Sequence, residues 1–266
     1  MLLTIDIGNT NITFGLYEGQ NLGPRWRIRT IHEKMSDEYG VLMDQLFRHR
    51  GYRPTQVTGI AIASVVPPLT LTFDQACRDY VGQEPLVVDA GVKTGVRIRY
   101  DNPRDVGADR IVDAAAVKAL YSVPACVVDF GTATTFDALS AEGNYLGGAI
   151  APGIGIAAQA LFERTAKLPR VEFSRPPSII GQNTPHAMQS GLLFGYVGLV
   201  EGMVSRFKAE LGLETHVIAT GNLADIISCE TDVIDIVDPW LTLRGLRAIY
   251  ELNVSKSVGQ VERAKA

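Results

Sequence analysis

A short pattern occurs twice in this chain, and the repeat constrains the fold more than any other feature. Asp6 ends an apolar segment and is followed by Ile7-Gly8-Asn9-Thr10-Asn11. Asp129 ends a second apolar segment and is followed by Phe130-Gly131-Thr132-Ala133-Thr134. Each apolar run is typical of a buried strand, and each glycine with its amide and hydroxyl neighbours is typical of a tight turn. Two copies are too few for a solenoid, so the pattern predicts two duplicated α/β domains.

The length and composition agree with this prediction. A chain of 266 residues corresponds to about two domains of ordinary size. Hydrophobic residues make up 46% and charged residues 20%, which is enough apolar material for folded cores and excludes a disordered chain. Because the second repeat begins just after residue 120, we expect one domain at 1–120 and the other at 121–266.

Strand and helix signals alternate through both halves. The first half predicts strands at 2–7, 12–17, 59–66 and 86–89, and helices at 36–50, 74–81 and 108–121. The second half predicts a strand from 125, a hairpin through 145–150, strands at 217–220 and 233–237, and helices at 155–167, 185–211 and 241–252.

Charge and cysteine content exclude several classes of partner. With 25 basic and 29 acidic residues, the net charge of −4 offers no broad basic surface for nucleic acid and no polybasic anchor for a membrane. No uninterrupted apolar run is long enough to span a bilayer. Cys77, Cys126 and Cys229 lie far apart and form no Cys-x-x-Cys pair, so neither a disulfide framework nor a cysteine zinc site is expected. These observations predict a cytoplasmic protein.

The repeated motif has a chemical interpretation. The amide groups and hydroxyls of a glycine turn can hold phosphoryl oxygens, while the preceding carboxylate can hold Mg²⁺ directly or through its waters. For a single copy, Asp6 or Asp129 ordering its own turn as an Asx motif is an equally simple explanation. Two copies at matching positions favour the functional explanation, because two phosphate loops facing each other would form one nucleotide cleft.

The polar segment 101–110 precedes and begins the alanine-rich helix. Asp109 in the first turn of that helix is favoured by the helix dipole, so structure alone can explain it. The functional interpretation is that Asp109 is a general base that accepts a hydroxyl proton, with Arg110 beside it for an anionic group.

A stripe of glycines lies on one face of the helix predicted at 185–211. It consists of Gly191, Gly195, Gly198 and Gly202. Glycines lower helix propensity, so the stripe predicts close approach of another backbone, either inside the domain or across a dimer axis.

Four motifs together resemble those of type III pantothenate kinases. They are the two aspartate loops, Gly107-Ala108-Asp109-Arg110 and Gly181-Gln182-Asn183-Thr184, and they occur in the family's order. The resemblance extends to residues 240–246 and so covers almost the whole chain. It implies the fold of the acetate and sugar kinase, heat-shock chaperone and actin superfamily, in which two ribonuclease H-like domains enclose a nucleotide cleft.

The resemblance also implies roles for individual residues. Asp109 is the base that deprotonates pantothenate, Asp6 lies near Mg²⁺, and Asp129 holds a monovalent cation, K⁺ or NH₄⁺. The implied ATP contacts are Asp6, Ile7, Gly8, Asn9, Thr10, Asn11, Ile12, Thr13 and Thr132. The implied pantothenate contacts are Tyr100, Gly107, Ala108, Asp109, Arg110 and Thr184. The family is dimeric, and Thr184 corresponds to a contact at the subunit interface.

The reaction implied is ATP-dependent phosphorylation of pantothenate to 4′-phosphopantothenate, the first step of coenzyme A biosynthesis. Two alternatives remain: another small-alcohol kinase of the same superfamily, or a non-catalytic regulatory relative. The family commonly has two glycines after the strand at 217–220, whereas this chain has Gly221 and Asn222. This difference leaves the nucleotide preference open.

Overall fold

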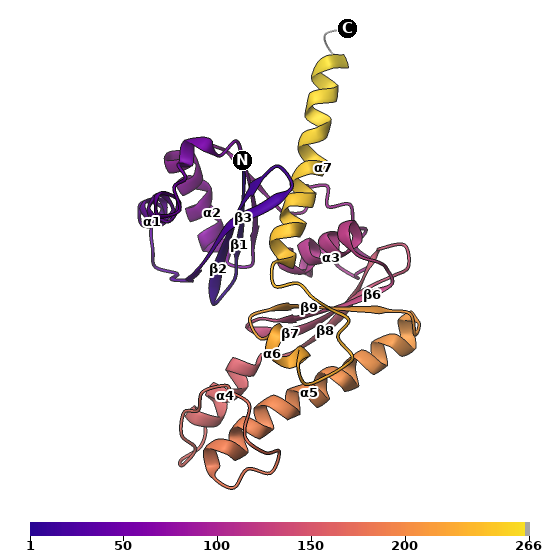
Figure 1. The fold of residues 1–266 in the computed structure, drawn as a ribbon. Helices are drawn as coiled ribbons and strands as arrows, with labels where there is room; N and C mark the ends of the chain where they lie inside the picture. Colours follow the sequence, from indigo (N-terminus) through magenta and orange to yellow (C-terminus); the bar gives the residue numbers. More distant parts are fainter. Residues whose placement is uncertain (264–266) are drawn as a thin grey trace. The chain divides into compact units, whose positions relative to one another are not determined.

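A computed structural model describes the backbone of residues 1–263 and the side chains of residues 1–254. The chain forms two compact units (Figure 1). Unit 1 combines Met1–Tyr121 with the C-terminal helix α7 (Leu241–Arg263), and unit 2 is Ser122–Trp240. The sequence placed residues 241–266 in the second domain, and the described part of this segment belongs to unit 1 instead. The reason is that α7 packs against a helix of unit 1, as described below.

Unit 1 is built on a five-stranded mixed sheet. Its strands are β1 (Leu2–Ile7), β2 (Asn11–Glu18), β3 (Asn21–Arg29), β4 (Gly59–Ser64) and β5 (Pro85–Val87). They lie in the order β3-β2-β1-β4-β5. The hairpin strands β1, β2 and β3 are antiparallel, whereas β4 and β5 continue the sheet parallel to β1.

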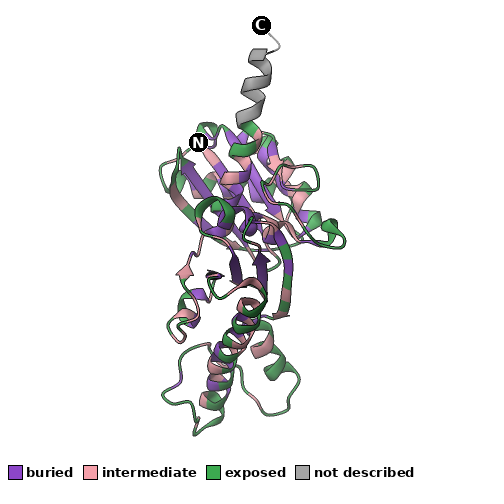
Figure 2. Cartoon of the chain, turned by 90° about the vertical axis from the view of Figure 1, so that its right-hand side faces the viewer, coloured by how far each residue is buried: buried purple, intermediate pink, exposed green. Residues whose placement is uncertain are grey.

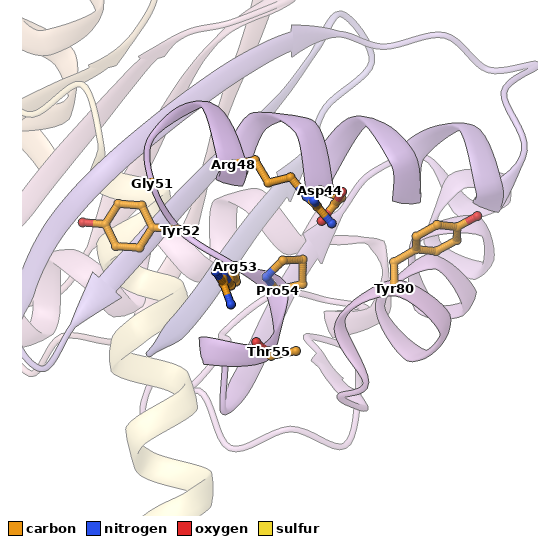
Figure 3. A pocket seen from close by; sticks show the side chains of 8 residues that line it. All are labelled: Asp44, Arg48, Gly51, Tyr52, Arg53, Pro54, Thr55 and Tyr80. Atoms are coloured by element: carbon orange, nitrogen blue, oxygen red, sulfur yellow. Dashed lines mark ion pairs between the residues drawn. The ribbon is translucent and has the colours of Figure 1, made fainter.

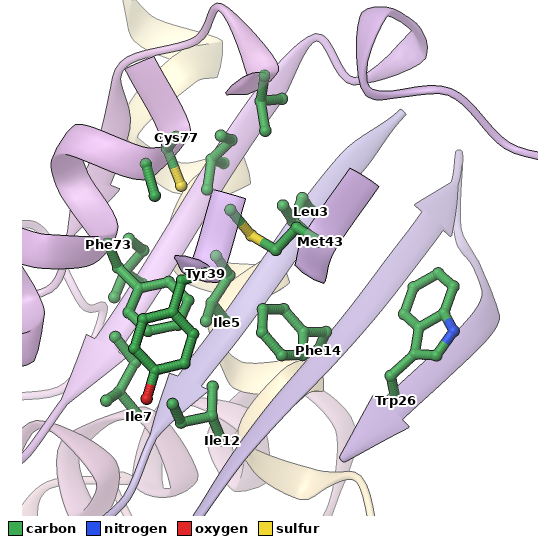
Figure 4. Close-up of a cluster of buried hydrophobic side chains, with 14 of the residues drawn as sticks. Leu3, Ile5, Ile7, Ile12, Phe14, Trp26, Tyr39, Met43, Phe73 and Cys77 are labelled. Carbon is green, nitrogen blue, oxygen red and sulfur yellow. The ribbon is translucent and has the colours of Figure 1, made fainter. Parts of the chain in front are cut away.

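Helices cover both faces of this sheet. Helices α1 (Ser36–His49) and α2 (Pro67–Ala76) lie on the face to which the apolar side chains of β1 point. Figure 4 shows Ile5 and Phe14 of the sheet beside Tyr39, Met43 and Phe73 of these helices. Helices α3 (Ala108–Leu120) and α7 cover the opposite face, where β4 presents small alanines. Because side chains alternate along a strand, Asp6 lies on the opposite face from Ile5 and Ile7.

The α7–α3 contact depends on a glycine. A Cβ on Gly245 would overlap the carbonyl oxygen of Val112 in α3, which is a backbone atom. Leu246 and Ile249 of α7 are fully buried beside Val112. The last helix therefore completes the core of unit 1.

Two predictions for unit 1 were wrong in detail. The helix predicted at 74–81 begins earlier, at Pro67, as α2, and its second part is a π-helical turn, Cys77–Val81. Proline suits the first turn of a helix, because the N–H groups of that turn have no partner within the helix and proline therefore loses no hydrogen bond there. Strand β3 was not predicted, because it contains Pro24 and alternating arginines; proline is tolerated there because β3 is an edge strand.

Unit 2 repeats this architecture. Its strands are β6 (Ala125–Phe130), β7 (Ala133–Leu139), β8 (Tyr145–Pro152), β9 (His216–Gly221) and β10 (Ile236–Val237). Its helices are α4 (Ile154–Glu163), α5 (Thr184–Leu211) and α6 (Ala224–Ser228). The order β8-β7-β6-β9-β10 and the strand directions match those of unit 1. The predicted duplication of α/β domains is therefore confirmed.

The strand registers make the two aspartates equivalent. Asp6 pairs with Thr13 on β2 and with Ala63 on β4. Asp129 pairs with Thr135 on β7 and with Thr220 on β9. Each aspartate thus occupies the same place, one residue before its central strand ends.

Helix α5 is the one helix of the described chain that is long and apolar enough, by length and composition, to cross a membrane. Its residues Leu193, Val197 and Val200 are nevertheless buried in the core of unit 2. In Figure 2 the helix accordingly shows buried and exposed residues along its length. This pattern is typical of the core helix of a globular domain.

Candidate functional site

The first aspartate loop is held by its own backbone and by the end of β3. The N–H of Gly8 donates to the carbonyl of Asn11 at 3.0 Å. Thr30, a buried residue, donates from its hydroxyl to the carbonyl of Gly8 at 2.6 Å and from its N–H to the carbonyl of Thr10 at 2.9 Å. Asn9 and Thr10 are exposed at the tip. The loop is thus a fixed turn with its polar tip open to a ligand.

The other members of this loop are not equally accessible. Ile7 and Ile12 are fully buried in the core of unit 1, and Thr13 is 8% exposed. Contacts from the two isoleucines to a ligand must therefore come from the backbone. Asp6 and Asn11 are half-buried on the rim of the loop.

Asp109 lies in the first turn of α3, which begins after Gly107. Its Oδ1 accepts the N–H of Arg110 at 2.8 Å, and the space that a Cβ on Gly107 would occupy lies against the same oxygen. Burial raises the pKa of Asp109 above its ordinary value of 3.8, although the N–H and the charge of Arg110 act in the opposite direction. The carboxylate is therefore fixed in position and more basic than an ordinary aspartate.

Within unit 1 the structure brings Asp109 to the same end of the sheet as the first loop. The N–H of Val65, just after β4, donates to the carbonyl of Ile7 at 3.0 Å. The side chain of Val65 in turn lies beside Gly107. The carboxyl ends of β1 and β4 thus meet the start of α3, which is where parallel α/β sheets bind ligands.

The remaining pantothenate candidates of unit 1 lie around this helix start. Arg110 is buried, with 9% of its surface exposed, whereas Tyr100 is 39% exposed. Gly107 and Ala108 are half-buried. Asn102 caps the short helix Pro103–Asp105 by accepting the N–H of Arg104, so part of this polar segment serves its own folding.

The second aspartate loop is closely surrounded by glycines. Gly221, at the end of β9, has a φ of 90°, and a Cβ there would lie 2.5 Å from Oδ1 of Asp129. A Cβ on Gly131 would lie 3.1 Å from Oδ2 of the same carboxylate. Gly153, which caps α4, lies against the carbonyls of Gly131 and Thr132. The glycines keep the space around the carboxylate clear, and Thr132 is exposed at the tip.

Thr184 lies elsewhere in unit 2, at the start of α5. It is exposed and lines a groove of about 960 Å³ between α4, the segment after α4 and α5. Exposed apolar side chains occur on the same elements, including Ile156, Leu161 and Phe162. The groove is therefore an apolar surface with Thr184 at one side.

A second concavity, of about 670 Å³, lies on unit 1 (Figure 3). It is bounded by the end of α1, where Arg48 pairs with Asp44 at 2.7 Å, and by Arg53 and Tyr80. None of its lining residues belongs to the predicted site.

The side chains that could act as donors limit how a metal ion can be held. The described residues contain no cluster of three or more His, Cys, Asp or Glu side chains that could hold a metal ion. Mg²⁺ fits this donor set only where substrate phosphates complete the coordination, and one carboxylate plus phosphates is its usual arrangement. At Asp129 the glycines at 131 and 221 bring no side chain against the carboxylate, and carboxylate oxygens are ligands that suit a larger cation.

Several residues that shape these loops were not predicted. Thr30 acts through its hydroxyl and its N–H, and Val65 acts through its N–H and packing; no sequence motif marks either residue. Asp137, a 2% exposed carboxylate in the middle of β7, could have been noticed as a charge inside an otherwise apolar strand.

Comparison with solved structures defines the class of fold. A Sinorhizobium meliloti protein described as a 2-dehydro-3-deoxygalactonokinase superposes with a TM-score of 0.58 at 12% identity, over 95% of this chain and 97% of its own. A Campylobacter jejuni protein assigned to the Baf family of transcriptional activators gives a TM-score of 0.58 at 20% identity, over 95% and 99%. The chain has the two-domain fold of the sugar kinases and actin-like ATPases.

Sequence comparison identifies the family within this class. The sequence model of the type III pantothenate kinases matches residues 2–206. The type III pantothenate kinase of Moorella thermoacetica is 54% identical over 253 residues, covering 95% of this chain and 100% of the relative. That of Geobacillus kaustophilus is 52% identical over 256 residues, covering 96% and 99%. The chain belongs to the type III pantothenate kinase family.

Proposed function

We propose that this protein transfers a phosphoryl group from ATP to pantothenate and forms 4′-phosphopantothenate, the first step of coenzyme A biosynthesis. Membership of the family supports the reaction. The observation that carries the proposal is the carboxylate of Asp109, which is fixed at the carboxyl ends of β1 and β4 by the start of α3. Positioning of this kind contributes most of the catalysis in phosphoryl transfer.

In unit 1, Asp109 acts as the general base that accepts the proton of the primary hydroxyl of pantothenate. Its raised pKa favours this role, because a more basic carboxylate takes a proton more readily. Tyr100, Gly107, Ala108 and Arg110 contact the substrate, and Arg110 balances the negative charge of the pantothenate carboxylate. Thr184 of unit 2 supplies a further contact.

Asp6 to Thr13 and Thr132 contact ATP. The exposed tips of both loops can supply N–H groups and hydroxyls to phosphoryl oxygens. Asp6 holds Mg²⁺ together with the phosphates. When bound, this ion neutralises charge on the phosphates; the residues named here orient them.

Asp129 holds the monovalent cation, K⁺ or NH₄⁺. Support comes from the glycines at 131 and 221, where a side chain would crowd the carboxylate. A large, weakly hydrated cation needs several oxygen ligands and room around them.

The protein functions as a homodimer in the cytoplasm. A Cβ built at Gly191, Gly195 or Gly198 meets no atom within 4 Å among the described residues, so the glycine stripe does not serve close packing inside the unit. The apolar groove beside α5 adds a surface that a second copy can cover. Replacing Gly195 with arginine is expected to convert the dimer to a monomer in sedimentation measurements.

The reaction is tested by coupling ADP release to a spectroscopic signal. Turnover is expected to require pantothenate, Mg²⁺ and either K⁺ or NH₄⁺, each omitted in turn. A panel of other small alcohols distinguishes this activity from that of a different kinase in the same superfamily. ADP release that ignores pantothenate, with another alcohol preferred, would contradict the assignment.

A non-catalytic regulatory role is the second candidate. The fold likeness to a Baf family protein does not favour it, since that similarity concerns the fold alone. The intact Asp6, Asp109 and Asp129 favour catalysis.

A further inference from the structure

A buried hydrogen-bonded group lies directly beside Asp129 in unit 2. Thr135 donates from Oγ1 to Oδ2 of Asp137 at 3.1 Å. The hydroxyl of Tyr145 donates to Oδ1 of Asp137 at 2.8 Å. Asp137 is 2% exposed and Tyr145 is fully buried, whereas Thr135 is half-buried at the edge of the group. We call these three residues the Asp137 network.

The sheet places Thr135 next to Asp129. The two residues are direct cross-strand partners between β6 and β7. Such partners share one face of the sheet, with Cβ atoms about 5 Å apart. The hydroxyl of Thr135 and the carboxylate of Asp129 therefore border the same space.

The network determines how the Thr135 hydroxyl can be used. A threonine hydroxyl has one proton and two lone pairs. Because Oδ2 of Asp137 accepts the hydrogen bond, the proton of Thr135 is committed to Asp137. The lone pairs remain on the side away from Asp137, and an oxygen in this state is a suitable ligand for a cation.

Unit 1 provides an internal comparison, since it has the same sheet. By strand register, Thr135 corresponds to Thr13, Asp137 to Gly15, and Tyr145 to Leu22. Unit 1 thus forms this sheet without the carboxylate or the tyrosine. Burying a carboxylate is costly even when it is hydrogen-bonded. The fold does not require that cost, which indicates that the network serves the site.

We infer that the Thr135 hydroxyl oxygen is a second protein ligand of the monovalent cation beside Asp129, and that Asp137, held by Tyr145, is the positioning residue that fixes its proton. This inference rests on the proposed cation role of Asp129. It adds Thr135 as a ligand and Asp137 with Tyr145 as the residues that orient its hydroxyl. It also explains why unit 2 carries the network and unit 1 does not.

The test measures cation binding without turnover. The unfolding temperature of the protein is recorded as KCl replaces choline chloride at constant ionic strength, because a ligand of the folded state stabilises it in proportion to its affinity. In the Thr135→Val variant, the K⁺ concentration giving half of the stabilisation should rise about 10-fold or more, the usual effect of disturbing a metal's surroundings. Thr135→Ser, which keeps the hydroxyl, should restore most of the response.

Thr134→Val is the matched control. Thr134 lies one residue earlier, on the opposite face of β7, and its buried Oγ1 has no hydrogen-bond partner among the described residues. Its replacement should leave the K⁺ response unchanged. An unchanged response in Thr135→Val as well would overturn the inference.

Asp137 is tested by the double variant Asp137→Val/Tyr145→Phe, which removes both polar partners together and leaves no new unpaired group between them. Its K⁺ response should weaken, and adding Thr135→Val should weaken it little further, because both changes disable one oxygen. If Thr135→Val weakened the K⁺ response as strongly in the double variant as in the wild type, the positioning role of Asp137 would be contradicted. If the wild-type protein phosphorylates pantothenate but shows no K⁺ response at all, this inference fails while the proposed reaction stands.

Discussion

Asp109 combines a favourable position with an unfavourable charge. The start of α3 stabilises a carboxylate, yet burial raises the pKa of this one above 3.8. A raised carboxyl pKa means that ionisation weakens the fold. The contribution of Asp109 to the free energy of unfolding is fully present at a pH below its pKa in the unfolded chain. It is lost as the pH rises through its higher pKa in the folded protein. At neutral pH the ionised Asp109, the proposed base, therefore lowers the stability of the folded protein.

The first prediction follows from this cost. Asp109→Asn should lower kcat by about 100-fold or more, the usual contribution of a general base. It should also raise the unfolding temperature at pH 7, because the buried charge is gone. Asp105→Asn, in the exposed short helix before α3, is the control and should change neither quantity much. A variant less stable than the wild type would contradict the account of Asp109.

The second prediction concerns pH. The base must be ionised to accept a proton, so kcat/KM should fall on the acid side. The apparent pKa of this limb should lie above 3.8, in the direction that burial shifts Asp109. The measurement is a pH profile of kcat/KM with the folded fraction checked at each pH. A limb at or below 3.8 would mean that another group controls the rate.

At the scale of elements, one contact determines where the last helix packs. Gly245 of α7 lies against the carbonyl of Val112 in α3, and a backbone oxygen cannot turn away as a side chain can. Gly245→Val should therefore destabilise unit 1 by about 1–3 kcal/mol, the usual cost of overpacking.

Denaturation followed through Trp26, buried in unit 1, checks this value in a Trp240→Phe background. Arg244→Ala, on the exposed side of the same helix, should change stability by about 0.5 kcal/mol or less. Equal effects of the two variants would show that the α7–α3 contact is not close.

Elements with strong periodic or capping signals could be predicted from the sequence. Strand 2–7 and the helices near 108–121 and 185–211 are confirmed to within a residue or two. Strand β3 and the start of α2 could not be predicted, because proline disrupts a strand or helix at some positions and is well tolerated at others. Pro24 is tolerated at a sheet edge and Pro67 begins a helix, and both contexts are tertiary facts.

At the scale of the molecule, the duplication was visible because two loops repeat one motif. The unit to which α7 belongs could not be predicted. Chain order alone places α7 with unit 2, which precedes it, whereas its packing on Val112 places it in unit 1. The candidate site was predicted through its polar motifs. The Asp137 network and Thr30 were missed because hydrogen bonds between strands have no fixed spacing in sequence.

The final prediction removes this helix. A chain ending at Trp240 loses the buried side chains of Leu243, Leu246 and Ile249. At about 1.5–3 kcal/mol each, their loss approaches the whole stability of an ordinary domain. Unit 1 should then lose its fixed packing and bind a hydrophobic dye, and a separate peptide of residues 241–266 should restore it. A truncated chain with native Trp26 fluorescence would contradict this.

The return of α7 also sets an order of events on the ribosome. Domains usually fold from the N-terminus as they are synthesised. Here the first-made unit waits for a helix, α7, that is synthesised after all the strands of unit 2. During translation, the alanine face of β4 therefore stays uncovered by α7 until that helix emerges, and in this interval it is a surface for chaperones to shield.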